Sequence, residues 1–328
     1  MKNFKELVMK FLMFSDLHYL PGKLYGPSKE TLRLLQKRAE DEKCDFIIHA
    51  GDFCYGPSCV AEYVAAYNGF HIPSYHCLGN HDCDRTPYAE VLKYYNMPNG
   101  YYHFDCKGYR VIVMDTNYYK SGDEYVHYEN REQFNHPSQL DSVPPHELDW
   151  LCDTVKSSPY PCIIISHASF ERECVIPKNE EEMIQLSHEA NASIFAPQIR
   201  EFVRSVNESS PHKILMLING HHHKDFLRII DNVLYWDVNS TCYEWVCDKP
   251  HDKFPEEICK AHTLANHTVV YNEPLSAVVT VEGTTITIDG AEATTFMGVT
   301  RETVGDFVLD RSGRPSSSKI QSARITLG

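Results

Sequence analysis

The segment Phe11-Leu12-Met13-Phe14-Ser15-Asp16-Leu17-His18 shows the arrangement on which the fold of this chain depends. Four apolar residues bounded by polar ones are consistent with a buried β-strand, and this one leads directly into a carboxylate and an imidazole. The same arrangement recurs four times along the chain. The later copies are Phe46–Ile48 before Gly51-Asp52, Tyr75–Leu78 before Gly79-Asn80-His81-Asp82, Ile163–Ile165 before Ser166-His167, and Ile214–Ile218 before Gly220-His221-His222-His223.

Helix-like stretches separate these apolar runs, and the alternation indicates a layered α/β architecture. Ser28 is a suitable N-cap for a helix that continues to about Glu42 and carries its apolar residues on one face. Because ligands bind at the carboxyl edge of open α/β sheets, polar side chains that follow several strands are expected to meet there. The repeated pattern therefore predicts one site built from distant parts of the chain.

We expect a main domain over residues 9–246 and a C-terminal extension over residues 247–328. The extension is loop-like to Ser276 and then predicts a β-hairpin that packs on the main domain, with its turn at Glu282-Gly283. A polar, Tyr-rich stretch at about 117–145 shows no clear period. Such long irregular segments are usually functional or mobile, and we expect this one to shape the substrate pocket.

Composition narrows the function classes. The chain has 328 residues with a net charge of −14, which argues against a nucleic-acid polymer as partner because phosphate backbones require clustered Lys and Arg. The 12 cysteines include no Cys-x-x-Cys pair, and with no usable signal peptide they indicate a reduced, cytoplasmic protein. No apolar run approaches the roughly 20 residues needed to cross a bilayer, so no membrane association is expected.

The ligand types favour particular metals. Carboxylate, imidazole and amide groups together suit Mn, Fe, Zn or Co, whereas an all-oxygen site would suit Mg or Ca. A carboxylate such as Asp52 can bridge two ions about 3.5–4 Å apart. His221 and His223 lie two residues apart, so on an extended segment both can face the site while His222 points away.

These motifs resemble the D-x-H, GD, GNH[DE], H and GHxH series of the calcineurin-like metallophosphoesterases, in the same order. The resemblance covers about Met9 to Ser240 and implies a two-layered β-sandwich flanked by helices, with two divalent or mixed-valence metal ions. It implies that one ion is bound by Asp16, His18, Asp52 and His223, and the other by Asp52, Asn80, His167 and His221. His81 would stabilise the phosphoryl oxygens or protonate the leaving group, and Asp82 would orient His81.

One departure from the family pattern bears on the substrate. In relatives of the Ser/Thr protein phosphatases the second motif continues as GDxVDRG, but here it reads Gly51-Asp52-Phe53-Cys54-Tyr55-Gly56. The Gly79-Asn80-His81-Asp82 form is similar to the branch that includes cyclic-nucleotide and glycerophosphodiester phosphodiesterases.

We therefore expect a phosphodiesterase that acts on a small phosphorylated molecule. The alternative is a phosphomonoesterase or nucleotide pyrophosphatase with the same site, and a non-catalytic interaction scaffold is a less favoured reading. Tyr19 and Tyr55 are candidates for shaping the pocket.

Overall fold

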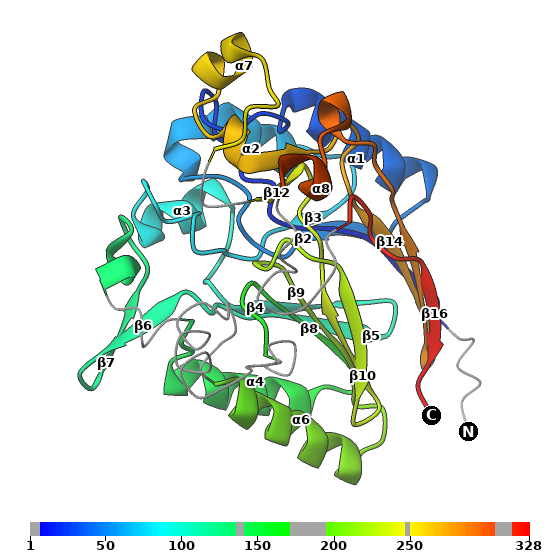
Figure 1. Cartoon of the computed structure of the whole chain (residues 1–328). Helices are drawn as coiled ribbons and strands as arrows, with labels where there is room; N and C mark the ends of the chain where they lie inside the picture. Colours follow the sequence, from blue (N-terminus) through cyan, green and yellow to red (C-terminus); the bar gives the residue numbers. More distant parts are fainter. Residues whose placement is uncertain (1–6, 136–140, 171–194, 247–249, 306–316) are drawn as a thin grey trace.

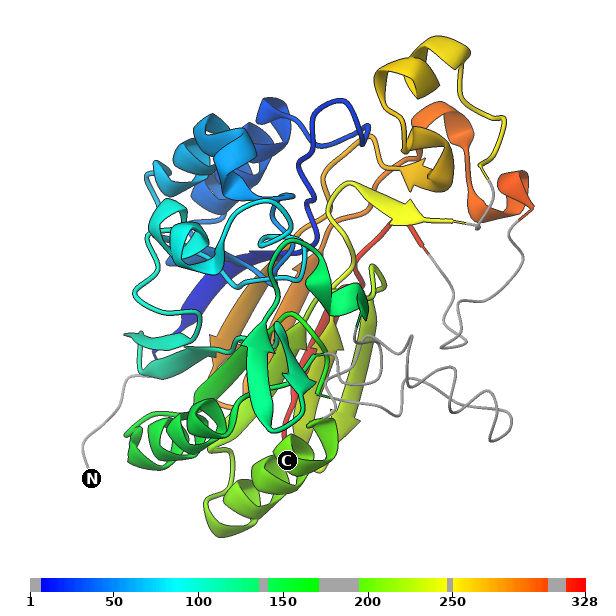
Figure 2. The same ribbon diagram turned by 90° about the vertical axis from the view of Figure 1, so that its left-hand side faces the viewer.

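The apolar runs form the strands of two β-sheets that pack face to face, with helices on their outer sides (Figures 1 and 2). The computed structural model describes residues 7–135, 141–170, 195–246, 250–305 and 317–328. Each sheet has six strands, in the orders β16-β15-β14-β1-β2-β3 and β10-β11-β9-β8-β5-β4. This architecture is the helix-flanked, two-layered sandwich that the resemblance of the motifs implies.

The first sheet combines three N-terminal strands that run parallel with three C-terminal strands that run antiparallel. Its strands are β1 (Met9–Phe14), β2 (Phe46–His49), β3 (Ser74–Tyr75), β14 (Ala277–Glu282), β15 (Thr285–Gly290) and β16 (Ala323–Thr326). The predicted hairpin of β14 and β15 forms, and β14 pairs directly with β1, Leu12 lying opposite Val278. The C-terminal part of the chain therefore completes the sheet that carries the first motif.

The second sheet has a mixed arrangement with its parallel strands in the middle. Its strands are β4 (Tyr102–Cys106), β5 (Tyr109–Val113), β8 (Cys162–Ser166), β9 (Ile214–Asn219), β10 (Phe226–Ile230) and β11 (Val233–Asp237). Alternate residues face opposite sides: Ile163 packs into the core between the sheets, whereas Ile164 packs toward the helices α4 (Pro145–Ser157) and α6 (Ala196–Ser209). This two-residue period buries both faces of the sheet.

Helices α1 (Lys29–Asp41), α2 (Ala61–Asn68) and α3 (Tyr88–Tyr94), with the 3-10 turn η1 (Pro57–Val60), flank the first sheet. Ser28 caps α1 as predicted. Its hydroxyl accepts the backbone N–H of Thr31, and the Thr31 hydroxyl accepts the N–H of Ser28. This reciprocal pair satisfies two N–H groups that a helix start leaves without partners.

The structure differs from the expectation in three segments. The stretch at 117–145 contains a hairpin of β6 (Tyr118–Ser121) and β7 (Glu124–His127), followed by η2 (Glu132–Asn135). Of the apolar run Tyr75–Leu78, which was expected to form a strand, only Tyr75 lies in one, the two-residue β3 (Ser74–Tyr75). The prediction of a loop before Ser276 is wrong, because this segment holds the helix α7 (Glu256–Ala261), the 3-10 turn η3 (Ala265–His267) and the strand β13 (Thr268–Val270). The remaining elements of the C-terminal part are β12 (Tyr243–Trp245), which pairs with β13, η4 (Phe296–Gly298) and α8 (Arg301–Val304).

The missed helix α7 has no buried residue, so it leaves no apolar period in the sequence. Most of the Ser- and Arg-rich stretch at 311–319, expected to lie over the domain or be partly flexible, falls outside the described residues. Within the described ranges, no helix is both long and apolar enough to cross a membrane.

Candidate metal centre

The predicted site residues meet at the carboxyl ends of five strands from both sheets. Three groups of side chains each bring their ligand atoms within 4.8 Å of one another: Asp16 with His18 and His223, His18 with Asp52 and His81, and Asp52 with His167 and His221. The groups share members, so they form one continuous cluster. All seven side chains predicted as metal ligands lie in it or, for Asn80, against it.

Asp52 occupies the middle of this cluster. Its Oδ2 lies 3.4 Å from Nε2 of His18 and 3.3 Å from Nε2 of His167, and its side chain is buried. One carboxylate oxygen thus faces histidines from two different groups of ligands. That is the position a bridge between two cations requires.

On one side of Asp52, Nε2 of His223 lies 3.0 Å from Nε2 of His18 and 3.3 Å from Oδ1 of Asp16. Burial lowers the pKa of His18 to about 4, against the opposing effect of Asp52, so this imidazole is neutral at pH 7. A neutral imidazole nitrogen beside a carboxylate is a ligand set that divalent transition metals accept.

On the other side, Nε2 of His167 lies 3.0 Å from Oδ1 of Asn80. The Nδ1 of His167 is 2.8 Å from the carbonyl oxygen of Ala50, and it must donate there because a carbonyl only accepts. Burial alone lowers the pKa of His167, but the carboxylates of Asp52 and Asp16 raise it to about 10. The carboxylates therefore stabilise a positive charge near Nε2 of His167, and a bound cation at this position would interact with the same carboxylate oxygens.

The backbone of the cluster is strained at most of its ligands. Asp16, His18, Asp52, His221 and His223 all have positive φ, between 49° and 70°. Side chains other than glycine rarely adopt this region, and each such residue costs about 1–3 kcal/mol. Five instances in one site indicate that the fold holds these turns in place to aim their side chains at a common point.

Two glycines allow the turns to approach one another. A Cβ on Gly51, whose φ is 95°, would collide with the ring of His167. A Cβ on Gly79 would collide with the backbone and carboxylate of Asp52. Both positions thus require glycine for steric reasons.

His81 belongs to one of the three groups of the cluster, but its hydrogen-bond partner differs from the predicted one. Nδ1 of His81 is 2.8 Å from Oδ2 of Asp84, whereas Asp82 accepts hydrogen bonds from the N–H groups of Gly79 and Cys54 and from the Tyr95 hydroxyl. The assignment of Asp82 as the residue that orients His81 is therefore wrong, because the turn directs Asp82 inward.

Asp84 takes the orienting place. Burial lowers the pKa of His81, but Asp52 and Asp84 together raise it above its usual value. The sequence offered one signal for Asp84, a second acidic residue two positions after Asp82.

Aromatic rings and one arginine border the cluster. The ring centroid of Tyr55 lies 5.2 Å from that of His18 and 4.5 Å from that of His81. The ring centroid of Tyr243 lies 5.5 Å from that of His223. Tyr55, one of the two predicted pocket residues, therefore reaches the site.

Tyr19, the other candidate, stacks on Tyr63 at 3.6 Å and serves packing. Nε of Arg131, from the segment at 117–145, lies 3.8 Å from Oδ2 of Asp84. Neither Tyr243 nor Arg131 belongs to a motif that the sequence made visible.

A family model for calcineurin-like phosphoesterases matches residues 9–225, which span all of these motifs. The chain belongs to the calcineurin-like phosphoesterase family. The family comprises metal-dependent phosphoester hydrolases that typically bind two metal ions, and the His and Asp clusters of this member fit that chemistry. Among curated proteins, none matches this chain.

Solved structures share the fold of this phosphoesterase at low sequence identity. A dimetal phosphatase from Danio rerio has a TM-score of 0.57 at 12% identity, covering 89% of this chain and 99% of that one. GAP50 of Plasmodium, described as the anchor in the inner membrane complex, has a TM-score of 0.51 at 11% identity, covering 98% and 90% of the two chains. At such identities the likeness shows the fold alone.

His222 and Lys224 of the phosphoesterase face partners outside the cluster. Nδ1 of His222 lies 3.2 Å from Oδ2 of Asp237. Lys224 forms a buried ion pair with Glu244, which also binds Arg301 at 2.8 Å. Arg301 belongs to the C-terminal part of the chain, which therefore contacts Glu244, the sequence neighbour of the Tyr243 that packs against His223.

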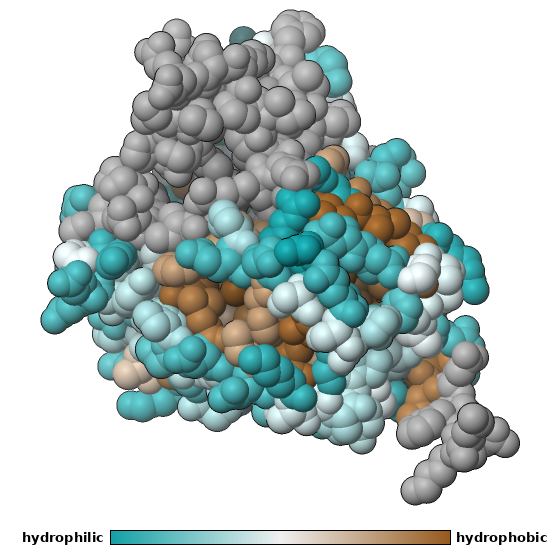
Figure 3. All heavy atoms as spheres, turned by 90° about the horizontal axis from the view of Figure 1, so that it is seen from below, coloured by the Kyte–Doolittle hydropathy of each residue, from teal (hydrophilic) through white to brown (hydrophobic). Residues whose placement is uncertain are grey.

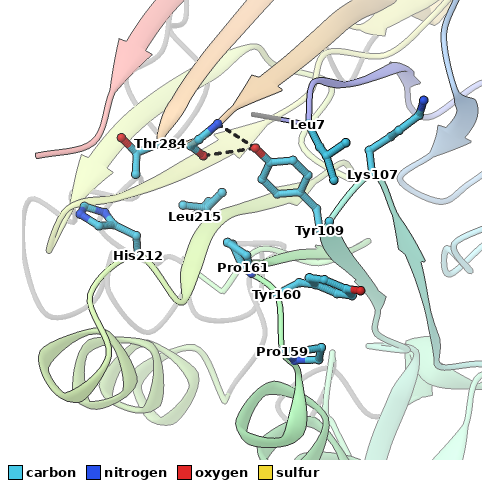
Figure 4. Close-up of a pocket in the computed structure, with 11 residues that line it drawn as sticks. Leu7, Lys107, Tyr109, Pro159, Tyr160, Pro161, His212, Leu215 and Thr284 are labelled. Atoms are coloured by element: carbon cyan, nitrogen blue, oxygen red, sulfur yellow. Dashed lines mark hydrogen bonds between the residues drawn. The ribbon is translucent and has the colours of Figure 1, made fainter. Parts of the chain in front are cut away.

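A separate cavity of about 590 Å³ lies at the opposite edge of the sheets (Figure 4). It is bordered by the β4–β5 and β14–β15 turns and by the starts of β8 and β9, and Tyr109, Tyr160 and Leu215 supply apolar walls. Seen from below, the molecule shows hydrophobic surface between hydrophilic side chains (Figure 3). No predicted site residue lines this cavity, so it is distinct from the metal centre.

Proposed function

We propose that this phosphoesterase hydrolyses a phosphodiester bond in a small molecule at a centre of two metal ions. The ligands in this proposal are Asp16, His18, Asp52, Asn80, His167, His221 and His223. The observation that carries it is the position of Asp52, whose single oxygen Oδ2 lies 3.4 and 3.3 Å from histidines of the two ligand groups. Mn, Fe and Zn fit this mixture of nitrogen and oxygen donors.

When bound, a pair of ions activates water and stabilises the charge that develops during in-line displacement at phosphorus. The protein supplies the geometry. Asp52 lies between the two sets of ligands and would bind both ions. The strained turns that carry the ligands Asp16, His18, His221 and His223 fix the directions of their side chains. A site whose ligands are held in advance loses little free energy to reorganisation as the reaction proceeds.

His81 is the group best placed to act on the substrate. Asp84 holds its Nδ1, so Nε2 is the nitrogen that can serve the reaction, and the raised pKa of His81 keeps the ring able to donate a proton near neutral pH. In our proposal, His81 Nε2 gives its proton to the leaving oxygen, and Asp84 stabilises the ring in the required orientation.

The charges around the cluster favour a diester over a monoester. Among the described residues, the cationic side chains near the cluster each contact a carboxylate: Arg131 contacts Asp84, and Lys224 and Arg301 both pair with Glu244. A phosphomonoester carries about two negative charges at pH 7 and needs more compensation than a diester, which carries one. The arrangement therefore supports a monoanionic substrate.

Hydrolysis of two chromogenic compounds tests this assignment. With Mn²⁺ added, we expect turnover of bis(p-nitrophenyl) phosphate with a higher kcat/KM than that of p-nitrophenyl phosphate, and loss of both activities with a chelator. His222→Ala is the matched control, because this histidine belongs to the same run yet faces Asp237. A reversed preference would favour the phosphomonoesterase alternative, and no turnover of either compound under any metal would favour a scaffold role.

A further inference from the structure

A continuous chain of hydrogen bonds leads away from the metal centre, starting at the far side of the His167 ring. Nδ1 of His167 donates to the carbonyl oxygen of Ala50 at 2.8 Å. That carbonyl belongs to the same peptide group as the N–H of Gly51, which donates to Nδ1 of His49 at 3.2 Å. One peptide group thus connects a predicted metal ligand with a buried histidine on β2.

The chain continues through a second buried histidine to the helix layer. Nε2 of His49 lies 2.8 Å from Nδ1 of His76, and Nε2 of His76 lies 2.7 Å from Oδ1 of Asn68. The side-chain amide of Asn68 donates to the carbonyl oxygen of Tyr94 at 2.8 Å. The rings of His49 and His76 are almost completely buried, with exposed fractions of 0% and 2%.

The groups at the two ends of this hydrogen-bond chain fix the same donor-to-acceptor direction along it. At one end, the N–H of Gly51 can only donate, so Nδ1 of His49 accepts and the proton of His49 sits on Nε2. At the other end, the carbonyl of Tyr94 can only accept, so Asn68 turns its oxygen toward His76 and the proton of His76 also sits on Nε2. The two assignments agree at the bond between the histidines, and every donor has one acceptor.

Both histidines are neutral, as this pattern requires. Burial lowers the pKa of His49 to about 3, and burial lowers the pKa of His76 well below its usual value. Aromatic rings enclose the pair: Tyr95 stacks on His76 at 3.9 Å, and Tyr67 meets His49 and His76 edge-on at 5.7 and 4.9 Å.

We infer that His49 and His76 are positioning residues that hold His167 in its metal-binding tautomer and strengthen it as a ligand. Hydrogen bonds in a chain of one direction polarise one another, so a carbonyl whose own peptide N–H is engaged accepts a proton more strongly. When a histidine donates its ring N–H to such a carbonyl, the orientation of the ring is fixed and its other nitrogen becomes more basic.

This inference rests on the proposed function, since it takes His167 to be a metal ligand. Two predicted ligands of the other ion provide a contrast. Among the described residues, no hydrogen-bond partner faces the buried Nδ1 of His18 or of His223. The hydrogen-bond chain therefore supports one side of the predicted metal pair specifically, and its loss should affect one ion more than the other.

The test uses His76→Phe, which keeps an aromatic ring against Tyr95 and removes the acceptor for the His49 proton. Metal-free protein is titrated with Mn²⁺ alone in a calorimeter. One of the two binding events should be weakened by about 10–100-fold, the usual effect of removing a hydrogen-bond partner that supports a metal ligand. Tyr67→Phe is the matched control. It removes a buried hydroxyl that donates to the carbonyl oxygen of Tyr75 in the same aromatic cluster, but it leaves the hydrogen-bond chain from His167 to Tyr94 intact. Both Mn²⁺ affinities should therefore be unchanged.

A second measurement needs no variant. In metal-free protein, ¹⁵N-resolved NMR of the histidine rings should find His49 and His76 neutral with the proton on Nε2. A proton on Nδ1 of either ring, or a charged ring at pH 7, would overturn the inference even if metals bind. Unchanged Mn²⁺ affinity in His76→Phe would also overturn it, while failure of the unmodified protein to bind Mn²⁺ would instead refute the proposed metal centre.

Discussion

Replacing Asp52 by alanine removes the carboxylate that lies between the two groups of ligand atoms. Its Oδ2 is 3.4 Å from Nε2 of His18 and 3.3 Å from Nε2 of His167, so both ions of the proposed pair lose a ligand and a negative charge together. Two unit charges 4 Å apart interact by about 4 kcal/mol at an effective dielectric constant near 20. Since about 1.4 kcal/mol is a tenfold change in affinity and a divalent ion carries more than one unit charge, binding of each ion should weaken by at least roughly a thousandfold.

Elemental analysis after gel filtration measures this effect as metal equivalents per chain. We expect about two equivalents in the unmodified protein, at most one in Asp52→Ala, and nearly complete loss of phosphoesterase activity. Asp52→Asn separates charge from shape, because an amide oxygen can still accept the His81 backbone N–H that Oδ1 accepts at 2.8 Å. An active Asp52→Ala protein with two full metal equivalents would refute the assignment of Asp52 as a bridge.

Three further substitutions test the surroundings of the cluster. His81→Ala should keep both metals and lower kcat by about 10²–10⁴-fold. If His81 is a general acid, this defect should be smaller for a substrate with a p-nitrophenolate leaving group. Normal kcat on substrates with poor and with good leaving groups would exclude a catalytic role. Asp84→Asn should lower the pKa of His81, because Asp84 is one of the two carboxylates that raise it, and should move the upper limb of the pH–rate profile to lower pH; an unmoved limb would mean that Asp84 does not act on His81. His222→Ala should keep metal content and most turnover, since its ring faces Asp237, and loss of one metal equivalent would show that the histidine run is assigned in the wrong register.

The sequence could predict the features that follow from local patterns. The capped helix after Ser28 was predictable because capping residues and an apolar face occur within one short segment. The meeting of Asp16, Asp52 and His167 was predictable because each follows an apolar strand, and strand ends in such sheets share an edge.

Other features depend on geometry that the sequence does not display. Asp84, and not Asp82, contacts His81, because a turn closed by the Asp84 N–H on the His81 carbonyl brings these two residues together, while Asp82 accepts backbone N–H groups. The pairing of β14 with β1 joins residues more than 250 positions apart, and the hairpin pattern alone cannot specify its neighbour. The hydrogen-bond chain through His49 was equally hidden, since a buried histidine in a strand carries no sequence signal of its partner.

Anomalous diffraction from crystals soaked in Mn²⁺ can show whether Asp52 bridges two ions, because it locates the ions without any assumption about the substrate. We expect two peaks about 3.5–4 Å apart. One should lie between Asp16 and His223 and the other between Asn80 and His167, with Asp52 touching both. A single peak, or two peaks away from Asp52, would contradict a bridged dinuclear centre in this protein.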